Sequence, residues 1–154
     1  VQVEHPVTEM ITSIDILKEQ ISIAAGNKIN LKQSGIRLFG HAIEFRINAE
    51  DPDKNFMPSP GKIDLYLPPG GPGVRVDGFL YSGYKVLPNY DSLLAKLLVW
   101  GSTREEAIAR GKRALNEFVI SGIKTTIPFH QKVLRNDNFC RGEVYTDFIS
   151  ANFG

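Results

Sequence analysis

Apolar and polar residues alternate over two segments of the chain, as they do in a β-strand that buries one face. The first segment is residues 1–4, where Val1 and Val3 alternate with Gln2 and Glu4. A strand at the very start of a chain is unusual, because chain ends are commonly frayed and polar. The pattern therefore predicts either a short strand that arises by chance or a chain that begins in the middle of a strand.

The second alternating segment is HAIEFRINA, residues 41–49. One face of the predicted strand would carry His41, Ile43, Phe45, Ile47 and Ala49. The opposite face would carry Ala42, Glu44, Arg46 and Asn48. This pattern predicts a strand that packs one face on a core and presents a carboxylate and a guanidinium on the other.

An apolar stripe at helical spacing lies between these two segments. It consists of Ile14, Leu17, Ile21 and Ala24, and Ile16 and Ile23 widen it. Ser13 is a favoured N-cap residue, and Gly26 suits the left-handed position that follows a helix. We predict a helix over residues 14–25.

Further short strands are predicted between Pro-rich and Gly-rich turns, at residues 62–67, 74–76, 81–87 and 92–100. In the first of these strands, one face would carry Ile63, Leu65 and Leu67. The last, SLLAKLLVW, is apolar enough to be either a buried strand or a short helix. The regular spacing of the strands before it favours a strand.

The last third of the chain shows a helical pattern. Ser102 with Glu105, or Thr103 with Glu106, provides a capping box at the start of a helix. The buried stripe of this helix would comprise Ile108, Leu115 and Phe118, with Ala107, Ala114 and Val119 beside it and Gly122 at its end. Pro128 marks the first turn of another helix, whose inward-facing residues would be Phe129, Val133 and Leu134. A short polar tail would follow this helix.

Strands followed by helices, without alternating βαβ units, are typical of an α+β fold. We therefore predict a mostly antiparallel sheet with flanking helices. No internal repeat or linker divides the sequence, so residues 1–154 are predicted to form one domain.

Composition and charge narrow the class of protein. The chain has 154 residues, is 42% hydrophobic and 23% charged, and has a formal net charge of +1. These values argue against a disordered chain, a collagen and a strongly basic nucleic-acid binder. No segment approaches the ~20 apolar residues that span a bilayer, so a membrane is not an expected partner. A nucleic acid is not expected either, because the net charge is close to zero. A single cysteine, Cys140, excludes an intrachain disulfide and fits a reducing compartment.

Common chemical motifs are missing from the sequence. Gly61-Lys62 is followed by Ile63, so it does not form a phosphate-binding loop, and the PPGGPG cluster has no helix behind it. The three histidines lie far apart without the spacing of metal ligands, so no metal site is predicted. Cys140 lies in a polar stretch that we expect to be exposed, which does not suit a nucleophile.

Two polar strand faces remain as candidate sites, one with Gln2 and Glu4 and the other with Glu44, Arg46 and Asn48. They can be solvated faces held by cross-strand ion pairs. Alternatively, a fixed glutamate can act as a general base while a fixed arginine holds a small oxyanion. The pattern alone leaves both interpretations open.

Five blocks of sequence, in order, resemble the biotin carboxylase family of the ATP-grasp group: VQVEHPVTEM, IAAG, GHAIEFRINAEDP, PSPGKI and NYDS. The similarity runs from residue 1 to about residue 149. The resemblance implies the carboxy-terminal domain of a biotin carboxylase, cut in mid-strand, without the N-terminal and ATP-grasp domains. A fragment of this kind is expected to be inactive alone.

The resemblance implies roles for four residues in a two-stage reaction, in which ATP activates bicarbonate and the N1 nitrogen of biotin is then carboxylated. Glu4 matches the glutamate that takes the proton from bicarbonate. Gln2 and the backbone amide of Val3 match groups that bind bicarbonate. Arg46 matches the arginine that contacts bicarbonate and the ureido oxygen of biotin, where its charge would stabilise a developing enolate.

Three further residues match the family pattern or support it. Asp91, in NYDS, matches an aspartate near the biotin end of the site, although capping of a turn is an alternative role. Glu44 is expected to orient Arg46 without touching the substrate. Arg75 matches an arginine of the family's dimer interface, and a solvated surface arginine is the alternative.

The resemblance also implies cofactors and partners. The complete enzyme would use biotin on a carrier protein, ATP, and Mg²⁺ or Mn²⁺, with most of the ATP and metal ligands upstream of this chain. The expected partners are the biotin carboxyl carrier protein, a carboxyltransferase and a second copy of the chain. The parent would be acetyl-CoA carboxylase of fatty acid biosynthesis, or a propionyl-CoA, pyruvate or related carboxylase, in the cytoplasm or in an organelle matrix or stroma. A self-standing module that binds biotin or its carrier, or that only dimerises, remains an alternative.

Overall fold

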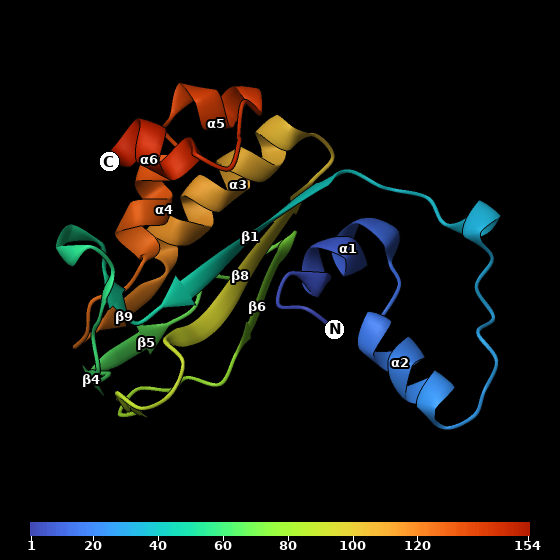
Figure 1. Ribbon diagram of the computed structural model, residues 1–154, viewed down its shortest axis with the longest axis horizontal. Coiled ribbons are helices and arrows are strands. Elements are labelled where there is room, and N and C mark those ends of the chain that lie inside the picture. The colour runs from blue at the N-terminus through green and yellow to red at the C-terminus, as the bar shows by residue number, and fades with distance from the viewer.

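The computed structural model describes residues 1–154 and contains a three-stranded antiparallel sheet with helices on both faces (Figure 1). The helices are α1 (His5–Thr12), α2 (Ile16–Ala24), α3 (Arg104–Glu117), α4 (Ile127–Val133), α5 (Asp137–Arg141) and α6 (Phe148–Phe153), with 3₁₀ turns at Gln33–Gly35 and Pro52–Lys54. The strands are β1 (His41–Asn48), β2 (Glu50–Asp51), β3 (Met57–Pro58), β4 (Gly61–Lys62), β5 (Leu65–Leu67), β6 (Val74–Gly78), β7 (Lys85–Val86), β8 (Leu93–Gly101) and β9 (Val119–Ser121). The predicted α+β fold with a mostly antiparallel sheet is confirmed.

Strand β8 is the centre of the main sheet, with β1 on one side and β6 on the other. The run SLLAKLLVW is therefore a strand, as its spacing favoured. Phe45 lies opposite Leu97, and Arg46 lies opposite Lys96. Since side chains alternate between the two faces of a strand, Phe45 and Leu97 lie on one face of the sheet, and Arg46 and Lys96 lie on the other. The second face is not wholly polar, since it also carries the buried Leu98. We call it the polar face because it holds the charged residues of β1 and β8. The remaining strands form the two-stranded pairs β2–β3, β4–β7 and β5–β9.

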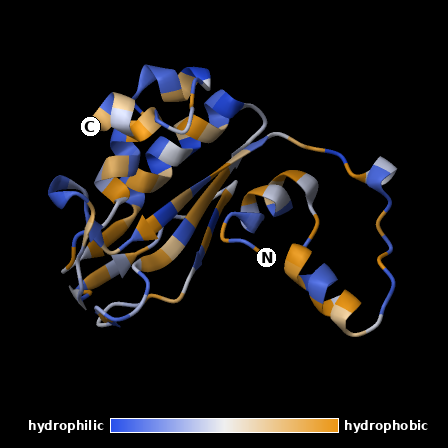
Figure 2. Ribbon diagram, in the orientation of Figure 1, coloured by the Kyte–Doolittle hydropathy of each residue, from blue (hydrophilic) through white to orange (hydrophobic).

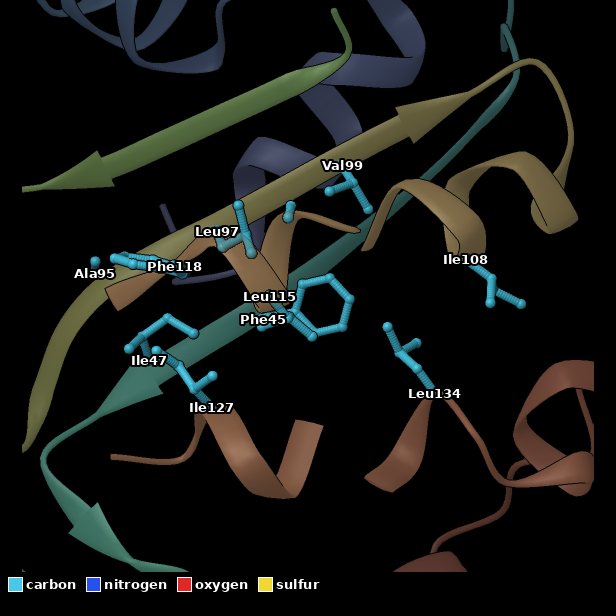
Figure 3. Close-up of a cluster of buried hydrophobic side chains, with 11 residues drawn as sticks. Phe45, Ile47, Ala95, Leu97, Val99, Ile108, Leu115, Phe118, Ile127 and Leu134 are labelled. Carbon is cyan, nitrogen blue, oxygen red and sulfur yellow. The ribbon is translucent and has the colours of Figure 1, made fainter. Parts of the chain in front are cut away.

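The core lies between the apolar row of the sheet and helices α3 and α4 (Figure 3). Leu97 and Val99 of β8 have no exposed surface, and Phe45 of β1 packs beside them. Helix α3 contributes Ile108, Ala114 and Leu115, with Phe118 just after its end, as the predicted stripe required. Thr103 caps this helix by accepting a hydrogen bond from the Glu106 amide, so the second of the two predicted capping sites is the one used.

Residues 1–4 do not form the predicted strand, so the alternation there was misleading. They form a turn in which the Gln2 carbonyl accepts hydrogen bonds from the His5 amide and the His5 Nδ1, at 3.3 and 2.7 Å. Helix α1 begins at once, with the buried Pro6 in its first turn. Proline is tolerated there because the N–H groups of the first turn have no partner within the helix. The predicted common strand face of Gln2 and Glu4 therefore does not exist.

The predicted helix over residues 14–25 is α2, but its start differs. Ser13 is in the left-handed conformation that ends α1, and Asp15 caps α2 by accepting from the Lys18 amide at 2.8 Å. None of the helix is buried, and Ile21 is 70% exposed. Figure 2 shows hydrophobic stretches, in orange, along α2, which stands apart from the sheet. Helical spacing thus predicted the helix, while its apolar stripe lies outside the core.

Three other expectations are corrected by the packing. Leu65 and Leu67 are exposed, because β5 pairs with β9 and turns Tyr66 toward Phe118 instead. Helix α3 ends at Glu117, where the chain becomes extended and forms β9, which leaves Val119 exposed at 37%. Gly122 therefore closes no helix.

The segment predicted as a strand at 81–87 is paired only at Lys85–Val86. The predicted polar tail instead forms α5 and α6, and Cys140 lies half-buried against the core. No helix of the structure combines the length and the apolar character needed to span a membrane.

Candidate functional site

Glu4 is placed at the polar face of the sheet by helix α1. It occupies the N-cap position of this helix, but its side chain accepts no hydrogen bond from the helix N–H groups. Its Oε2 instead accepts a hydrogen bond of 3.1 Å from Nη2 of Arg46, which lies 42 residues away along the chain. The carboxylate is therefore committed to Arg46, although a favourable capping position was available to it.

Arg46 projects from the polar face of β1 and is half-exposed, with 51% of its side chain accessible. Its hydrogen bond to Glu4 is the only one that its side chain makes within the chain. Nε lies 3.9 Å from Oε1 of Glu44, which is an ion-pair contact but too long for a hydrogen bond. The other N–H donors of the guanidinium are consequently available to a ligand.

Glu44 lies two residues before Arg46 on the same face of β1, with only 6% of its side chain exposed. Its Oε2 is sealed from solvent and has no hydrogen-bond partner. Burial raises the pKa of Glu44 above its usual range, and the nearby charges of Lys96 and Arg46 oppose that rise. The predicted role beside Arg46 fits this position, although the contact is electrostatic and not a hydrogen bond.

The backbone of residues 2–4 reaches the same place. The Val3 carbonyl accepts a hydrogen bond of 3.2 Å from Nζ of Lys96, while the Val3 amide donates to no group of the chain. The Gln2 side chain is exposed and also makes no hydrogen bond within the chain. The structure thus brings Val3 and Glu4 to the polar face of the sheet that carries Arg46. Gln2 precedes them in the chain but makes no contact with that face through a hydrogen bond.

Asp91 and Arg75 are not joined to this cluster by any contact. The Oδ1 of Asp91 accepts from the Leu93 amide at 2.8 Å, so its carboxylate caps the turn before β8. Arg75 pairs with Glu9 of α1 at 2.9 Å and with Asp77 at 2.8 Å. The hydrogen bond to Asp77 is the main cause that raises the pKa of Arg75. Arg75 therefore locks α1 onto β6 within one chain, and its predicted dimer contact stays a prediction.

The comparison with family models places this site in a known context. Residues 44–151 match the model described as the biotin carboxylase C-terminal domain. The chain belongs to that family. Residues 1–32, which include α1 and α2, match the model of the carbamoyl-phosphate synthase L chain ATP binding domain. The cluster thus joins Glu4 from the second matched region to Arg46 from the first.

Individual relatives agree with the family. The chain is 60% identical to Biotin carboxylase 1 of Bacillus subtilis over 98% of its length, and 57% identical to the biotin carboxylase of a Nostoc species over 97%. These matches cover 34% and 33% of the two relatives. The chain therefore spans about a third of the curated relatives that it matches.

Solved structures show the same fold. The biotin carboxylase domain dimer of Hydrogenobacter thermophilus 2-oxoglutarate carboxylase, in complex with MgADP, ADP and bicarbonate, matches with a TM-score of 0.96 and 49% identity. That match covers 98% of this chain and 33% of the other. The biotin carboxylase subunit of pyruvate carboxylase matches with the same TM-score and 47% identity, over 98% of this chain and 34% of that one.

Two residues of this biotin carboxylase domain that sequence reasoning missed support the site. Lys96 is the only charged residue within the nine-residue strand β8, and an isolated charge in an apolar strand is the signal that could have found it. His130 of α4 lies 2.8 Å from the Arg46 carbonyl through Nε2, and its ring packs edge-on against Phe45. His130 thus fixes the backbone that carries Arg46.

Protonation of His130 is expected to destabilise the domain. Burial lowers the pKa of His130 below its usual value of 6.5, so the unfolded chain takes up this proton at a higher pH than the folded chain. The free energy of unfolding should therefore fall as the pH drops below about 6.5, and this effect should be absent above that pH. His130→Gln keeps an N–H donor for the Arg46 carbonyl but does not titrate, so it should weaken this pH dependence.

Urea unfolding of the chain between pH 5 and pH 8 measures the effect. His41→Gln is the matched control, because His41 is exposed and should leave the pH dependence as it is in the unmodified chain. An unchanged pH dependence in His130→Gln would contradict the assignment.

The residues present do not suggest a metal centre. Nowhere in the structure do three or more His, Cys, Asp or Glu side chains gather closely enough to hold a metal ion. What the cluster can do is hold a small anion, by the donors of Arg46 and Val3, beside the carboxylate of Glu4.

Proposed function

We propose that this chain supplies the bicarbonate-binding and biotin-binding part of a biotin carboxylase, which carboxylates biotin on a carrier protein with ATP and bicarbonate. The observation that carries the proposal is the contact of Glu4 with Arg46 at 3.1 Å, on an open face where Arg46 keeps unused donors. The bicarbonate named for the 2-oxoglutarate carboxylase structure supports it.

Stability does not account for the pairing of Glu4 with Arg46. Both side chains are more than half exposed, and exposed ion pairs contribute only about 0–1 kcal/mol to stability. A base and a fixed cation held side by side at the surface suit a ligand that is both an acid and an anion. Bicarbonate has both properties.

Each residue has a distinct task in the proposed reaction. Glu4 accepts the proton of bicarbonate. The bicarbonate oxygen then becomes a better nucleophile toward the phosphoryl group that ATP supplies. The Val3 amide and the Gln2 side chain donate to the bicarbonate oxygens. Arg46 contacts bicarbonate and then the ureido oxygen of biotin, where a permanent positive charge stabilises the enolate that forms when N1 loses its proton. The phosphate released as the activated bicarbonate yields CO₂ would take this proton, and N1 would then bond to the carbon of CO₂. Glu44, buried beside Arg46, offsets part of the positive charge of the guanidinium.

The complete enzyme would take further groups from outside this chain. ATP supplies the phosphoryl group that activates bicarbonate, and Mg²⁺ or Mn²⁺ accompanies it. The match of residues 1–32 to an ATP binding domain model supports a nucleotide site adjacent to α1 and α2. The exposed apolar side chains of α2 are consistent with such a neighbour.

The proposed partners follow from the same chemistry. A biotin carboxyl carrier protein would deliver biotin to Arg46 and Asp91, and a carboxyltransferase would pass the carboxyl group to acetyl-CoA in fatty acid biosynthesis or to a related acceptor. A second copy would dock near Arg75, whose side chain is 37% exposed. The dimer named for the 2-oxoglutarate carboxylase domain supports this arrangement.

Glu4→Gln in the complete carboxylase should impair bicarbonate-dependent turnover and spare ATP binding. Glutamine keeps the size and the hydrogen-bonding ability of the side chain, but it cannot accept the proton of bicarbonate, and general-base catalysis contributes about 10²–10⁴-fold. Steady-state kinetics with varied bicarbonate, together with ATP titration, measure both effects. Glu143→Gln is the matched control, because Glu143 is an exposed carboxylate paired with Arg141 at 3.0 Å. Unchanged bicarbonate kinetics in Glu4→Gln would remove Glu4 from the mechanism.

A further inference from the structure

The side chain of Lys96 occupies a position that needs an explanation. It lies directly opposite Arg46 on the neighbouring strand, and two cations in register across an antiparallel pair repel each other. It interrupts a strand whose other residues are apolar or glycine. A charge at such a position requires partners that compensate it.

Asp77 is the expected partner by register, since it lies opposite Lys96 on β6. Both of its carboxylate oxygens are used by Arg75, through two hydrogen bonds of 2.8 Å from Nε and Nη2. The only side-chain hydrogen bond that Lys96 makes is the 3.2 Å contact of Nζ with the Val3 carbonyl. This contact joins residues that are 93 positions apart.

Glu44 supplies the missing negative charge. Its side chain is only 6% exposed, on the face that carries Arg46 and Lys96. The sealed Oε2 cannot reach a bound ligand, so its influence is electrostatic. Lys96 is the largest of the charges that lower the pKa of Glu44, followed by Arg46 and His5. One buried carboxylate thus allows two cations to lie side by side.

We propose that Lys96 is a positioning residue that holds the Val3 carbonyl, and with it the Glu4 carboxylate and the Val3 amide, against the strand that carries Arg46. The inference rests on the proposed function, because it explains how residues 2–4 are kept in a geometry suited to bicarbonate. Outside helix α1, which begins at His5, the Lys96 bond and the Glu4–Arg46 pair are the two side-chain hydrogen bonds that join this segment to the sheet.

Lys96→Met in the complete carboxylase tests the proposal, because it keeps the length of the side chain and removes its charge and donors. Amide hydrogen exchange over residues 3–7 should become faster, since the hydrogen bonds of the His5 and Val7 amides depend on the held turn. The KM for bicarbonate should rise about tenfold, the effect of losing one charged hydrogen bond, with the KM for ATP unchanged. Lys96→Arg should recover most of both properties.

The control is Lys112→Met, which removes an exposed lysine of α3 that makes no ion pair and should change neither property. If Lys96→Met does not yield folded protein, Lys96→Gln, with a shorter neutral donor, gives the same comparison. Unchanged exchange over residues 3–7 would overturn the role of Lys96, whatever the activity. Faster exchange with an unchanged KM for bicarbonate would support the tether and overturn instead the assignment of bicarbonate to residues 2–4.

Discussion

Arg46→Ala in the complete carboxylase is expected to slow biotin carboxylation by about 10²–10³-fold, or roughly 2.7–4 kcal/mol of barrier, because Arg46 acts as a donor to a developing oxyanion. The backbone of Arg46 is held in β1, where its carbonyl accepts a hydrogen bond from His130, and the guanidinium is held by Glu4. Little reorganisation is therefore needed when charge develops on the substrate. Alanine removes the charge and all of its donors while leaving the strand intact. Initial rates with saturating ATP and bicarbonate measure the loss.

Two variants show whether this loss is specific. Arg46→Lys keeps the charge but not the planar fork of donors, so it should recover only part of the rate. Arg113→Ala removes an arginine of similar exposure, which pairs with Glu117 at 2.7 Å on α3, and should leave the rate unchanged. Normal turnover in Arg46→Ala would refute the main assignment of the site.

Leu97→Ala should produce the largest change in stability, a loss of about 2–5 kcal/mol in the free energy of unfolding. Leu97 has no exposed surface, lies at the centre of the middle strand and packs among the core residues between the sheet and α3 (Figure 3). Truncation leaves a cavity that the paired strands on both sides cannot easily collapse. Chemical denaturation of the chain, followed by circular dichroism, gives the free energy directly.

Leu87→Ala is the matched control for this core substitution. Leu87 is 41% exposed and lies just after β7, so the same truncation there should cost much less. Equal losses at Leu87 and Leu97 would show that Leu97 does not lie in a core between the sheet and α3.

The parts of the fold with strong local signals could be predicted from the sequence. Strand β1 has a long alternation, and α3 combines a capping residue, Thr103, with a sustained apolar stripe. Residues 1–4 were too few for alternation to be decisive, and Pro6 in the first turn of a helix was the better signal. Leu65 and Leu67 were assigned to the wrong face because β5 pairs with β9, a partner that no local pattern reveals.

The site was less predictable than the fold. Local pattern placed Glu44 and Arg46 on a polar face, but it did not reveal that Glu44 is buried there while Arg46 stays half-exposed. The contact of Arg46 with Glu4 spans 42 residues, and only the family resemblance paired them in advance. Lys96 could be noticed as an isolated charge in an apolar strand, but its partner could not be predicted, because the Val3 carbonyl lies 93 positions away along the chain.

The most direct test of the central claim is the transfer of labelled bicarbonate to biotin by the complete carboxylase that carries this chain. With ATP and Mg²⁺ we expect acid-labile label on biotin, lost in Arg46→Ala and in Glu4→Gln, and retained in Arg113→Ala. If the folded protein binds ATP but transfers no label to free or carrier-bound biotin, or if the Arg46 and Glu4 variants transfer it normally, the account of this site is wrong.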